Sequence, residues 1–435
     1  MKPNRPGPRA PQPPAPLSSA VDRKKKKIVR HFLFLQGVAS PFFARLADRI
    51  RGGGDAIDRL NFCTGDVLLW RRHPAKSFCE PLAALPKYLD GLFEKHDCTD
   101  IVLFGNQRPV HLPAIFLAQE PGIRVHVFEE GYIRPNWITL ERGGVNGESR
   151  LPRDPAWFVR VNENLPDYGG GRPVRTSLAV RAAHDMAYHI ANLADPVLFP
   201  GYRSHRPYHP ALEYAGWARR FSALPFRRRG DARRFLDLVE GRAPFFLLPL
   251  QLFGDFQITR HSPFSSMADA LAEVLQSFAS SAPAETRLLI KNHPLDTGLF
   301  DYRKRLAELE RELDLRGRVF FVEAGDLPAM IAAAQGVVVV NSTVGMTALQ
   351  MGRPVKALGT AIYDLPGLTY QGTLQDFWQG PAPPGREIFE AFRNVVIHTT
   401  QVNGDFYTRE GIAMAVEGCL PRLLAERSPL EELLG

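Results

Sequence analysis

The feature that most constrains the fold is a short apolar run that ends abruptly in polar residues. Residues 287–296 read RLLIKNHPLD, so three large aliphatic side chains precede Lys291, Asn292, His293 and Pro294. Such a run is typical of a strand buried between helices. Ligands of open α/β sheets bind at the carboxyl ends of strands. The pattern therefore predicts a covered parallel sheet with Lys291 and His293 at its binding edge.

The same residues also fit a plain helix-entry turn whose polar side chains are only solvated. His–Pro pairs are not rare here, since His73–Pro74 and His209–Pro210 are two more. Neither of those pairs follows an apolar run of this kind. The preceding strand, together with the restricted backbone that Pro294 imposes on His293, favours the binding edge.

Length and composition indicate a soluble globular protein with two domains. The chain has 435 residues, of which 45% are hydrophobic and 23% charged. No apolar run approaches the roughly 20 residues that span a bilayer, and we expect no signal peptide. The four cysteines lie far apart without a CxxC pair, which indicates reduced cytosolic thiols: Cys63, Cys79, Cys98 and Cys419.

The positive charge is concentrated in one segment. Residues 172–234 contain 12 Arg, no Lys and 4 acidic residues, an excess as large as the +8 of the whole chain. Such a segment suggests an anionic partner: a membrane surface, nucleic acid or a phosphorylated substrate. No RNA-binding signature is present. We expect this segment to help dock the protein on an anionic bilayer.

The hydrophobic pattern divides the chain into five segments. They are a disordered Pro-rich and basic tail, an α/β domain, an Arg-rich helical connector, a second α/β domain and C-terminal helices, at residues 1–27, 28–165, 166–235, 236–385 and 386–435. Strands of the first domain are predicted at 28–35, 66–70, 101–104 and 125–128. Strands of the second are predicted at 245–250, 288–290, 319–322 and 337–340.

The first domain offers two candidate sites at strand ends. Gln36 and Gly37 form the turn between the first strand and a helix whose N-terminus could receive an anion, although no GxGxxG fingerprint is present. Glu129 and Glu130 follow the strand at 125–128, and Arg134 lies just beyond them. A buried carboxylate beside another can have the raised pKa that acid/base catalysis needs. A helix cap or a surface acidic pair is the alternative.

Residues 138–155, which read ITLERGGVNGESRLPRDP, are polar and Gly-rich. This stretch is long enough to be a functional loop or a lid.

The second domain repeats this arrangement. Its first strand is followed by Gln251 and then Asp255, and the strand at 337–340 runs into Asn341, Ser342, Thr343 and Gly345. Hydroxyl groups and free N–H groups at a helix start suit a phosphate, although a plain helix cap also explains them.

Several motifs together resemble one family. HFLFLQGVASPFFARLAD, VFEEGYIRPNWITLE, GVNGESRLPRDP, PLQLFGDFQI, IKNHPLD and NSTVGMTALQMGRPV are similar to the bacterial capsule polysaccharide synthesis family, and most similar to its KpsS-type β-Kdo transferases. The resemblance covers about residues 30–400. The short motifs EEG, HP and ST also resemble those of bacterial sialyltransferases.

The resemblance implies a GT-B architecture, in which two Rossmann-like domains face a central cleft. It implies CMP-Kdo as donor, no metal, and phosphatidylglycerol or its lyso form as acceptor. The product would start the lipid-linked poly-Kdo linker of a capsule. The protein would be cytoplasmic and peripheral on the inner face of the inner membrane, with a second Kdo transferase and the export machinery as further partners and no nucleic acid.

The residues supply a mechanism that agrees with this implication. Lys291, His293 and the hydroxyls of Ser342 and Thr343 could neutralise the donor phosphate without a metal. β-Kdo made from CMP-β-Kdo retains its configuration, and retention commonly uses a carboxylate nucleophile. Asp255 occupies the matching position in the family pattern, which leaves Glu129 or Glu130 as acid/base.

Three alternatives stay open at this point. Asp255 could cap a helix or pair with Arg260. The enzyme could use another CMP- or UDP-sugar, as an inverting sialyltransferase-like transferase does. The chain could also be a non-catalytic component of capsule export or assembly.

Overall fold

The computed structural model describes residues 29–70, 74–168, 170–203, 208 and 210–435. The predicted disordered tail at 1–27 lies outside the described residues. So do the imidazoles of the other two His–Pro pairs, His73 and His209.

The first sheet has seven strands in the order β12-β6-β5-β4-β1-β2-β3. Five of them run parallel, whereas β6 pairs antiparallel with β5 and β12 antiparallel with β6. The strands are β1 His31–Phe34, β2 Ala56–Asn61, β3 Lys76–Ser77, β4 Asp100–Phe104, β5 Arg124–Glu130, β6 Trp137–Arg142 and β12 Gln401–Asn403.

Helices cover both faces of this sheet. One face packs on α1, joined by α16, and the other packs on α3 and α4. The helices of this part are α1 Phe42–Gly52, α2 Thr64–Trp70, α3 Leu85–His96, α4 Leu112–Leu117 and α5 Pro155–Asn162, with 3-10 turns η1 Leu82–Ala84 and η2 Asn146–Glu148.

Two predictions for the first domain are wrong. Residues 66–70 are not a strand but belong to α2, and the strand that pairs beside β1 is β2. The stretch expected to be a loop as far as Pro155 begins with β6, whose side chains are almost all buried. A short apolar run fits a helix or a strand equally well, which explains the first error.

The second sheet is entirely parallel, in the order β11-β10-β7-β8-β9. Its strands are β7 Phe245–Pro249, β8 Arg287–Lys291, β9 Val319–Val322, β10 Gly336–Val339 and β11 Val355–Ala357. The aliphatic run of β8 is completely buried, as predicted. Each such side chain contributes about 1.5–3 kcal/mol on burial, so this run fixes β8 firmly between β7 and β9.

Helices also cover both faces of the second sheet, in two separate apolar clusters. They are α9 Phe256–His261, α10 Met267–Ser281, α11 Tyr302–Glu312, α12 Leu327–Ala333, α13 Val344–Gln350 and α14 Leu374–Phe377. The expected α/β architecture with two Rossmann-like domains is therefore confirmed.

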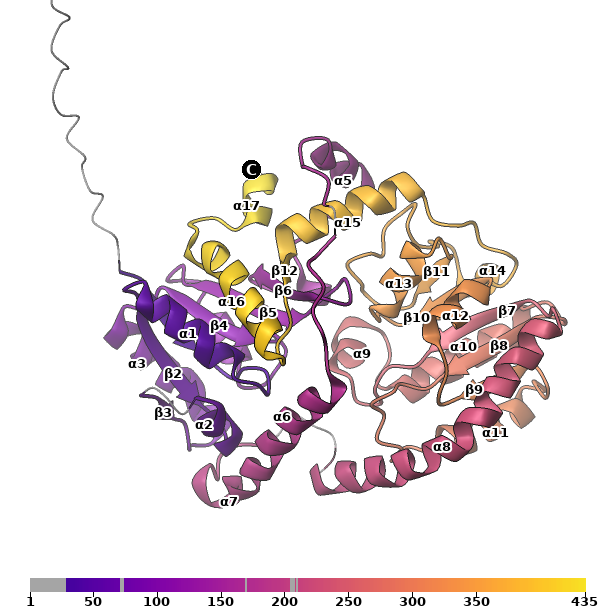
Figure 1. Ribbon diagram of the computed structural model, residues 1–435, viewed down its shortest axis with the longest axis horizontal. Helices are drawn as coiled ribbons and strands as arrows, with labels where there is room; N and C mark the ends of the chain where they lie inside the picture. The colour runs from indigo at the N-terminus through magenta and orange to yellow at the C-terminus, as the bar shows by residue number, and fades with distance from the viewer. Residues whose placement is uncertain (1–28, 71–73, 169, 204–207, 209) are drawn as a thin grey trace, which may run out of the picture.

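The connector is helical, and it runs along one edge of the molecule (Figure 1). It contains α6 Leu178–Ala191, the 3-10 turn η3 Asn192–Ala194, α7 Asp195–Leu198 and α8 Pro210–Glu240. Part of its positive charge is neutralised inside the protein, since Arg220 and Arg227 both pair with Glu323 of the second domain. The predicted membrane contact is therefore not supported for Arg227.

The C-terminal segment crosses back from the second domain to the first (Figure 1). Helix α15 Arg386–Thr400 packs on α5 and on the core of the second domain. The chain then adds β12 to the first sheet, and α16 Arg409–Leu424 packs on α1, before α17 Pro429–Leu434. The short strand β12 was not predicted from sequence.

Candidate active site

The carboxyl ends of both sheets face one another. A pocket between the domains is lined by Tyr132 and Asn146 from the first domain and by Gln257, Asn341 and Thr343, among others, from the second. The turn η2 contacts α9 across this boundary. Strand ends of both domains therefore share one cleft, as sequence reasoning expected for each sheet separately.

Glu129 is the first acid/base candidate, because its pKa lies near neutral pH. It stands near the carboxyl end of β5, and its Oε1 accepts a hydrogen bond of 2.9 Å from the backbone N–H of Glu130. Burial raises the pKa of Glu129 to about 7, and the charges of Glu130 and Asp255 add to this rise. The Glu129 carboxyl group therefore lies within electrostatic range of Asp255 across the cleft, in the condition that acid/base catalysis requires.

Glu130 has different partners. Its carboxylate forms an ion pair of 3.0 Å with Arg181 of α6 and accepts a hydrogen bond of 2.9 Å from the Tyr407 hydroxyl. The guanidinium of Arg181 also stacks over the Tyr407 ring. Glu130 therefore joins the first sheet to the connector and the C-terminal segment, which leaves Glu129 as the better acid/base candidate.

Asp255 caps a helix, as the alternative proposed. Its Oδ1 accepts a hydrogen bond of 2.9 Å from the Gln257 N–H, so Asp255 is the N-cap of α9. Its Oδ2 lies 3.5 Å from the amide nitrogen of Gln251. Burial raises the pKa of Asp255. Capping occupies one oxygen and fixes the side chain, so the second oxygen can still act as a nucleophile toward the cleft.

Lys291 is placed differently from its predicted role. Its ammonium is buried and donates to the carbonyl oxygens of Asn292, at 2.7 Å, and Glu323, at 3.0 Å. Burial lowers the pKa of Lys291 to about 8. Lys291 therefore stabilises the turn after β8 through these two backbone carbonyls. This geometry does not support the predicted contact between Lys291 and the donor phosphate.

The two ring nitrogens of His293 differ in their hydrogen bonding. Its Nδ1 accepts a hydrogen bond of 3.1 Å from the Leu295 N–H, so the neutral ring carries its proton on Nε2. Burial lowers the pKa of His293 to about 4, and the charges of Lys291 and Arg134 add to this effect. Within the described part of the chain, Nε2 makes no hydrogen bond. It is a neutral hydrogen-bond donor for an anion, so His293 can bind the predicted phosphate but cannot neutralise its charge.

The turn that carries His293 is fixed by an arginine from the connector. Arg220 of α8 donates to the carbonyl oxygens of His293, Pro294 and Asp296, at 2.8–3.0 Å. Its Nε pairs with Glu323 at 3.1 Å. Pro294 therefore contributes a carbonyl that anchors the turn.

The strand ends of β7 and β10 are joined by an amide pair. Gln251 donates to the Asn341 side chain at 3.0 Å and accepts from the Asn341 backbone N–H at 3.2 Å. Asn341 in turn donates to the carbonyl of Gln257 at 2.6 Å. The two predicted substrate-binding amides therefore position the loop that carries Asp255.

Only part of the segment after Asn341 faces the pocket between the domains. Ser342 accepts from the Val344 N–H at 3.2 Å, and Tyr363 donates to its carbonyl. A side chain at Gly345 would collide with the Tyr363 ring, so this glycine serves close packing. Thr343 lines the pocket between the domains and is the member of this group that faces it.

Gln36 and Gly37 follow β1 in the first domain and form a hydrogen-bonded group there. Gln36 is buried; its amide nitrogen donates to the Tyr188 hydroxyl at 3.2 Å, and its oxygen accepts from Arg108 at 3.1 Å. The Gly37 carbonyl accepts from the same guanidinium at 3.0 Å. Asp66 completes this group, 3.4 Å from the Gln36 amide nitrogen. Gln36 therefore positions Arg108 in the first domain.

Arg134 donates to the Gly131 carbonyl at 3.2 Å, and its charge acts on His293 across the cleft. Arg108, Arg181 and Tyr407 are the residues that sequence reasoning missed. Arg108 directly follows the polar segment Gly105-Asn106-Gln107 behind the predicted strand at 101–104, so its position was a readable signal. Arg181 lies in the connector and Tyr407 in the C-terminal segment. The sequence around neither residue indicates that the two side chains contact each other.

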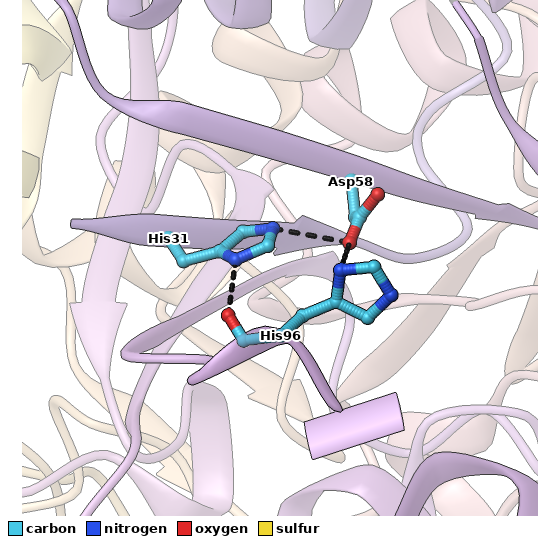
Figure 2. A group of neighbouring side chains, drawn as sticks. All are labelled: His31, Asp58 and His96. Carbon is cyan, nitrogen blue, oxygen red and sulfur yellow. Dashed lines mark hydrogen bonds and ion pairs between the residues drawn. The ribbon is translucent and has the colours of Figure 1, made fainter. Parts of the chain in front are cut away.

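The described residues contain one group of His and Asp side chains that could hold a metal, namely His31, Asp58 and His96 (Figure 2). His31 Nε2 and His96 Nδ1 lie 3.0 and 3.1 Å from one oxygen of Asp58. The Lys76 ammonium already contacts the other nitrogen of His96 at 2.8 Å. The group lies toward the amino ends of β1 and β2, opposite the edge that carries Gln36, so it is not part of the cleft.

Comparison with known proteins places the chain in a family. The model of the "Capsule polysaccharide biosynthesis protein" family matches residues 99–407. The chain belongs to this capsule polysaccharide biosynthesis family. It is 35% identical over 392 residues to the capsule polysaccharide modification protein LipB of Neisseria meningitidis serogroup B, covering 87% of this chain and 92% of LipB.

A second relative of the capsule family is the capsule polysaccharide export protein KpsS of Escherichia coli. It is 35% identical over 383 residues, covering 87% of this chain and 97% of KpsS. The resemblance stated from the motifs is therefore confirmed. A solved structure, Thermosulfurimonas dismutans KpsC, β-Kdo 2,7 transferase, is 13% identical with a TM-score of 0.40, covering 83% and 89% of the two chains. Similarity at that level supports no further conclusion.

Across the described residues, no helix combines the length and hydrophobicity needed to cross a membrane.

Proposed function

We propose that this capsule family member is a retaining β-Kdo glycosyltransferase. It transfers Kdo from CMP-β-Kdo to a phosphatidylglycerol-type lipid, or its lyso form, and so starts the lipid-linked poly-Kdo linker of a capsule. The observation that carries the proposal is the pair Glu129 and Asp255, one from a strand end of each domain, whose pKa values are both raised and whose charges act on each other. Retaining transfer commonly uses two carboxyl groups, one as nucleophile and one as acid/base.

The first half of the reaction uses the second domain. An Asp255 oxygen forms a bond to the anomeric carbon of Kdo while the bond to the CMP phosphate oxygen breaks, and that oxygen keeps the electron pair. His293 Nε2–H donates a hydrogen bond to the departing phosphate, as its tautomer allows. A fixed donor at a developing charge lowers the barrier by about 2–4 kcal/mol.

The second half uses the first domain. The acceptor hydroxyl attacks the same carbon, Glu129 takes the hydroxyl proton, and the Asp255 carboxylate leaves. Two inversions give retention. Glu129 is suited to this task because its pKa of about 7 lies near the pH of the reaction. Arg108 and Arg181 supply positive charge on the acceptor side of the same cleft.

The direct test is incubation of the purified protein with CMP-Kdo and a phosphatidylglycerol acceptor. The expected result is release of CMP and a product heavier by Kdo units, with full activity in excess EDTA because the His293 Nε2–H and the Thr343 hydroxyl would bind the donor phosphate without a divalent ion. If nucleotide is released only from a UDP-sugar or from CMP-sialic acid, then that sugar nucleotide, and not CMP-Kdo, is the donor. Loss of activity in EDTA with recovery on adding Mg²⁺ would contradict the metal-free mechanism.

A further inference from the structure

Two histidines and an aspartate meet on the first sheet, away from the cleft. His31 is the first residue of β1, Asp58 lies in β2 opposite Leu33, and His96 is the last residue of α3. Paired residues of neighbouring strands point to the same face of a sheet, as do residues two apart on one strand. Leu33 packs in the apolar cluster that contains the buried side chains of α3. All three side chains therefore lie on the face of the sheet that α3 covers.

These side chains bring three possible ligand atoms together. His31 Nε2 and His96 Nδ1 lie 3.0 and 3.1 Å from Asp58 Oδ2, and all three atoms lie within 4.8 Å of one another (Figure 2). Around a tetrahedral zinc ion with bonds of about 2.0–2.1 Å, ligand atoms lie roughly 3.3 Å apart. The two nitrogen–oxygen distances are therefore close to those of a zinc site.

The Asp58 carboxylate has an oxygen that no hydrogen bond satisfies. Within the described part of the chain, Asp58 Oδ2 is buried and no hydrogen bond reaches it, because neither imidazole contact has hydrogen-bond geometry. The His31 ring donates from Nδ1 to the carbonyl oxygen of His96, which can only accept (Figure 2). In the neutral ring, Nε2 therefore carries a lone pair beside the carboxylate oxygen. A cation between these two atoms would satisfy both, and a carbonyl that fixes the far ring nitrogen is the usual support of a metal-binding histidine.

The Lys76 ammonium contacts the outer nitrogen of His96. Lys76 Nζ lies 2.8 Å from His96 Nε2, and because an ammonium group only donates, Nε2 carries the lone pair in this state. A metal at Nδ1 needs the ring proton on Nε2 instead. On metal binding, Nδ1 therefore gives its proton to water, Nε2 takes one from water, and the Lys76 ammonium leaves. The Lys76 side chain is only partly buried, so it can turn to solvent. Lysine and metal thus compete for His96.

We propose that His31 Nε2, Asp58 Oδ2 and His96 Nδ1 bind one Zn²⁺ ion. Two imidazoles with one carboxylate suit Zn²⁺, whereas Mg²⁺ and Ca²⁺ prefer oxygen ligands alone. The three side chains are 16–25% exposed, so an ion can enter from solvent and water can fill the fourth position. The ion joins β1, β2 and α3 and so stabilises the first domain. It lies opposite the strand ends that carry Gln36, so this inference is independent of the transfer proposed above.

The test uses the full chain, treated with EDTA under reducing conditions and then dialysed free of chelator. Calorimetric titration with Zn²⁺ or Mg²⁺ measures affinity and stoichiometry, and thermal melting with and without Zn²⁺ measures stabilisation. Asp58→Asn removes the charge of the central ligand. Asp97→Asn is the matched control, since it makes the same change at the exposed residue beside His96, where Asn also tolerates the left-handed backbone. His96→Ala, at the end of α3, removes a second ligand and serves if Asp58→Asn does not fold.

Wild type and Asp97→Asn are expected to bind one Zn²⁺ per chain and to melt at a higher temperature in its presence, with no effect of Mg²⁺. Asp58→Asn and His96→Ala should bind Zn²⁺ at least about tenfold more weakly, since loss of an outer contact alone costs about 10–100-fold. Lys76→Met should bind it more tightly than wild type, because no ammonium has to leave His96.

No Zn²⁺ binding by wild type, or equal binding by Asp58→Asn and Asp97→Asn, overturns the site. Weaker binding by Lys76→Met overturns the competition between lysine and metal. Loss of transfer activity in EDTA concerns the proposed mechanism, whereas the dependence of the melting temperature on Zn²⁺ concerns this site, so the two failures are distinguishable.

Discussion

Glu129 and Glu130 are adjacent residues with different surroundings. Glu130 is neutralised by Arg181, whereas Glu129 is half-buried and feels the negative charges of Glu130 and Asp255. We expect Glu129→Gln to lower kcat by about 10²–10⁴, because a general base is lost. In the wild type, kcat should rise with pH through about 7, since Glu129 must be ionised to accept the proton. A Glu129→Gln enzyme with the wild-type pH profile would contradict this assignment.

The same residue makes a prediction for stability. The pKa of Glu129 rises from an ordinary 4.5 to about 7 in the folded protein, so the folded state favours the protonated form. That stabilisation is present below pH 4.5 and is lost as pH rises through 7. Glu129→Gln should therefore be more stable than wild type at pH 8, by on the order of 2 kcal/mol, and equal to it near pH 4. Denaturant unfolding at the two pH values measures the difference.

His293→Ala should lower turnover strongly while the protein stays folded. The reason is loss of the Nε2–H donor at the departing phosphate, which costs about 2–4 kcal/mol. The neutral ring also predicts that turnover does not fall between pH 6 and 8 through loss of a histidine charge, since the pKa of His293 is about 4. Single-turnover kinetics with CMP-Kdo measures the step. Activity near that of the wild type would remove His293 from the site.

At the scale of elements, the turn after β8 is supported by a helix far away in sequence. Arg220→Met keeps the length of the side chain but removes its hydrogen bonds to the turn carbonyls and to Glu323. Breaking a buried pair of this kind typically costs about 3–5 kcal/mol, so the melting temperature and kcat should both fall. Arg229→Met, at an exposed position of the same helix, is the control. An unchanged melting temperature for Arg220→Met would show that the turn is held by other contacts.

Elements with strong local patterns could be predicted from sequence, and elements set by distant partners could not. The buried run of β8 and the polar residues behind it were readable because strand burial and strand ends are local features. The strand β12 has only three residues and exists because β6 offers an antiparallel edge, a contact that spans 262 residues between Thr139 and Gln401. The connector's arginines were read as one basic surface, yet Arg220 and Arg227 face the buried carboxylate of Glu323, which lies about a hundred residues away.

The candidate site shows the same division. Gln36, Glu129, Asp255, His293 and Thr343 were found because each follows a strand, and the parallel sheets bring such positions to one edge. Which of them touch substrate depends on partners that sequence does not reveal. The side-chain amide of Gln36 forms hydrogen bonds with four polar neighbours, and the Lys291 ammonium forms hydrogen bonds with two carbonyl groups. Both residues therefore position the residues around the site.

At the scale of the whole molecule, the two domains are held together by a C-terminal segment that belongs to both. Helix α15 packs on the second domain and β12 on the first, so the facing of Glu129 and Asp255 depends on residues 386–403. In the proposed mechanism, Asp255 of the second domain is the nucleophile and Glu129 of the first domain is the general base of one retaining transfer. Asp255 must then carry the sugar for part of each cycle.

Intact-protein mass spectrometry after incubation with CMP-Kdo alone tests this claim most directly. We expect one added Kdo, mapped by peptide analysis to the segment with Gly254 and Asp255, that accumulates in Glu129→Gln and is absent from Asp255→Asn. Transfer activity in Asp255→Ala, or an adduct on another carboxylate, would contradict it.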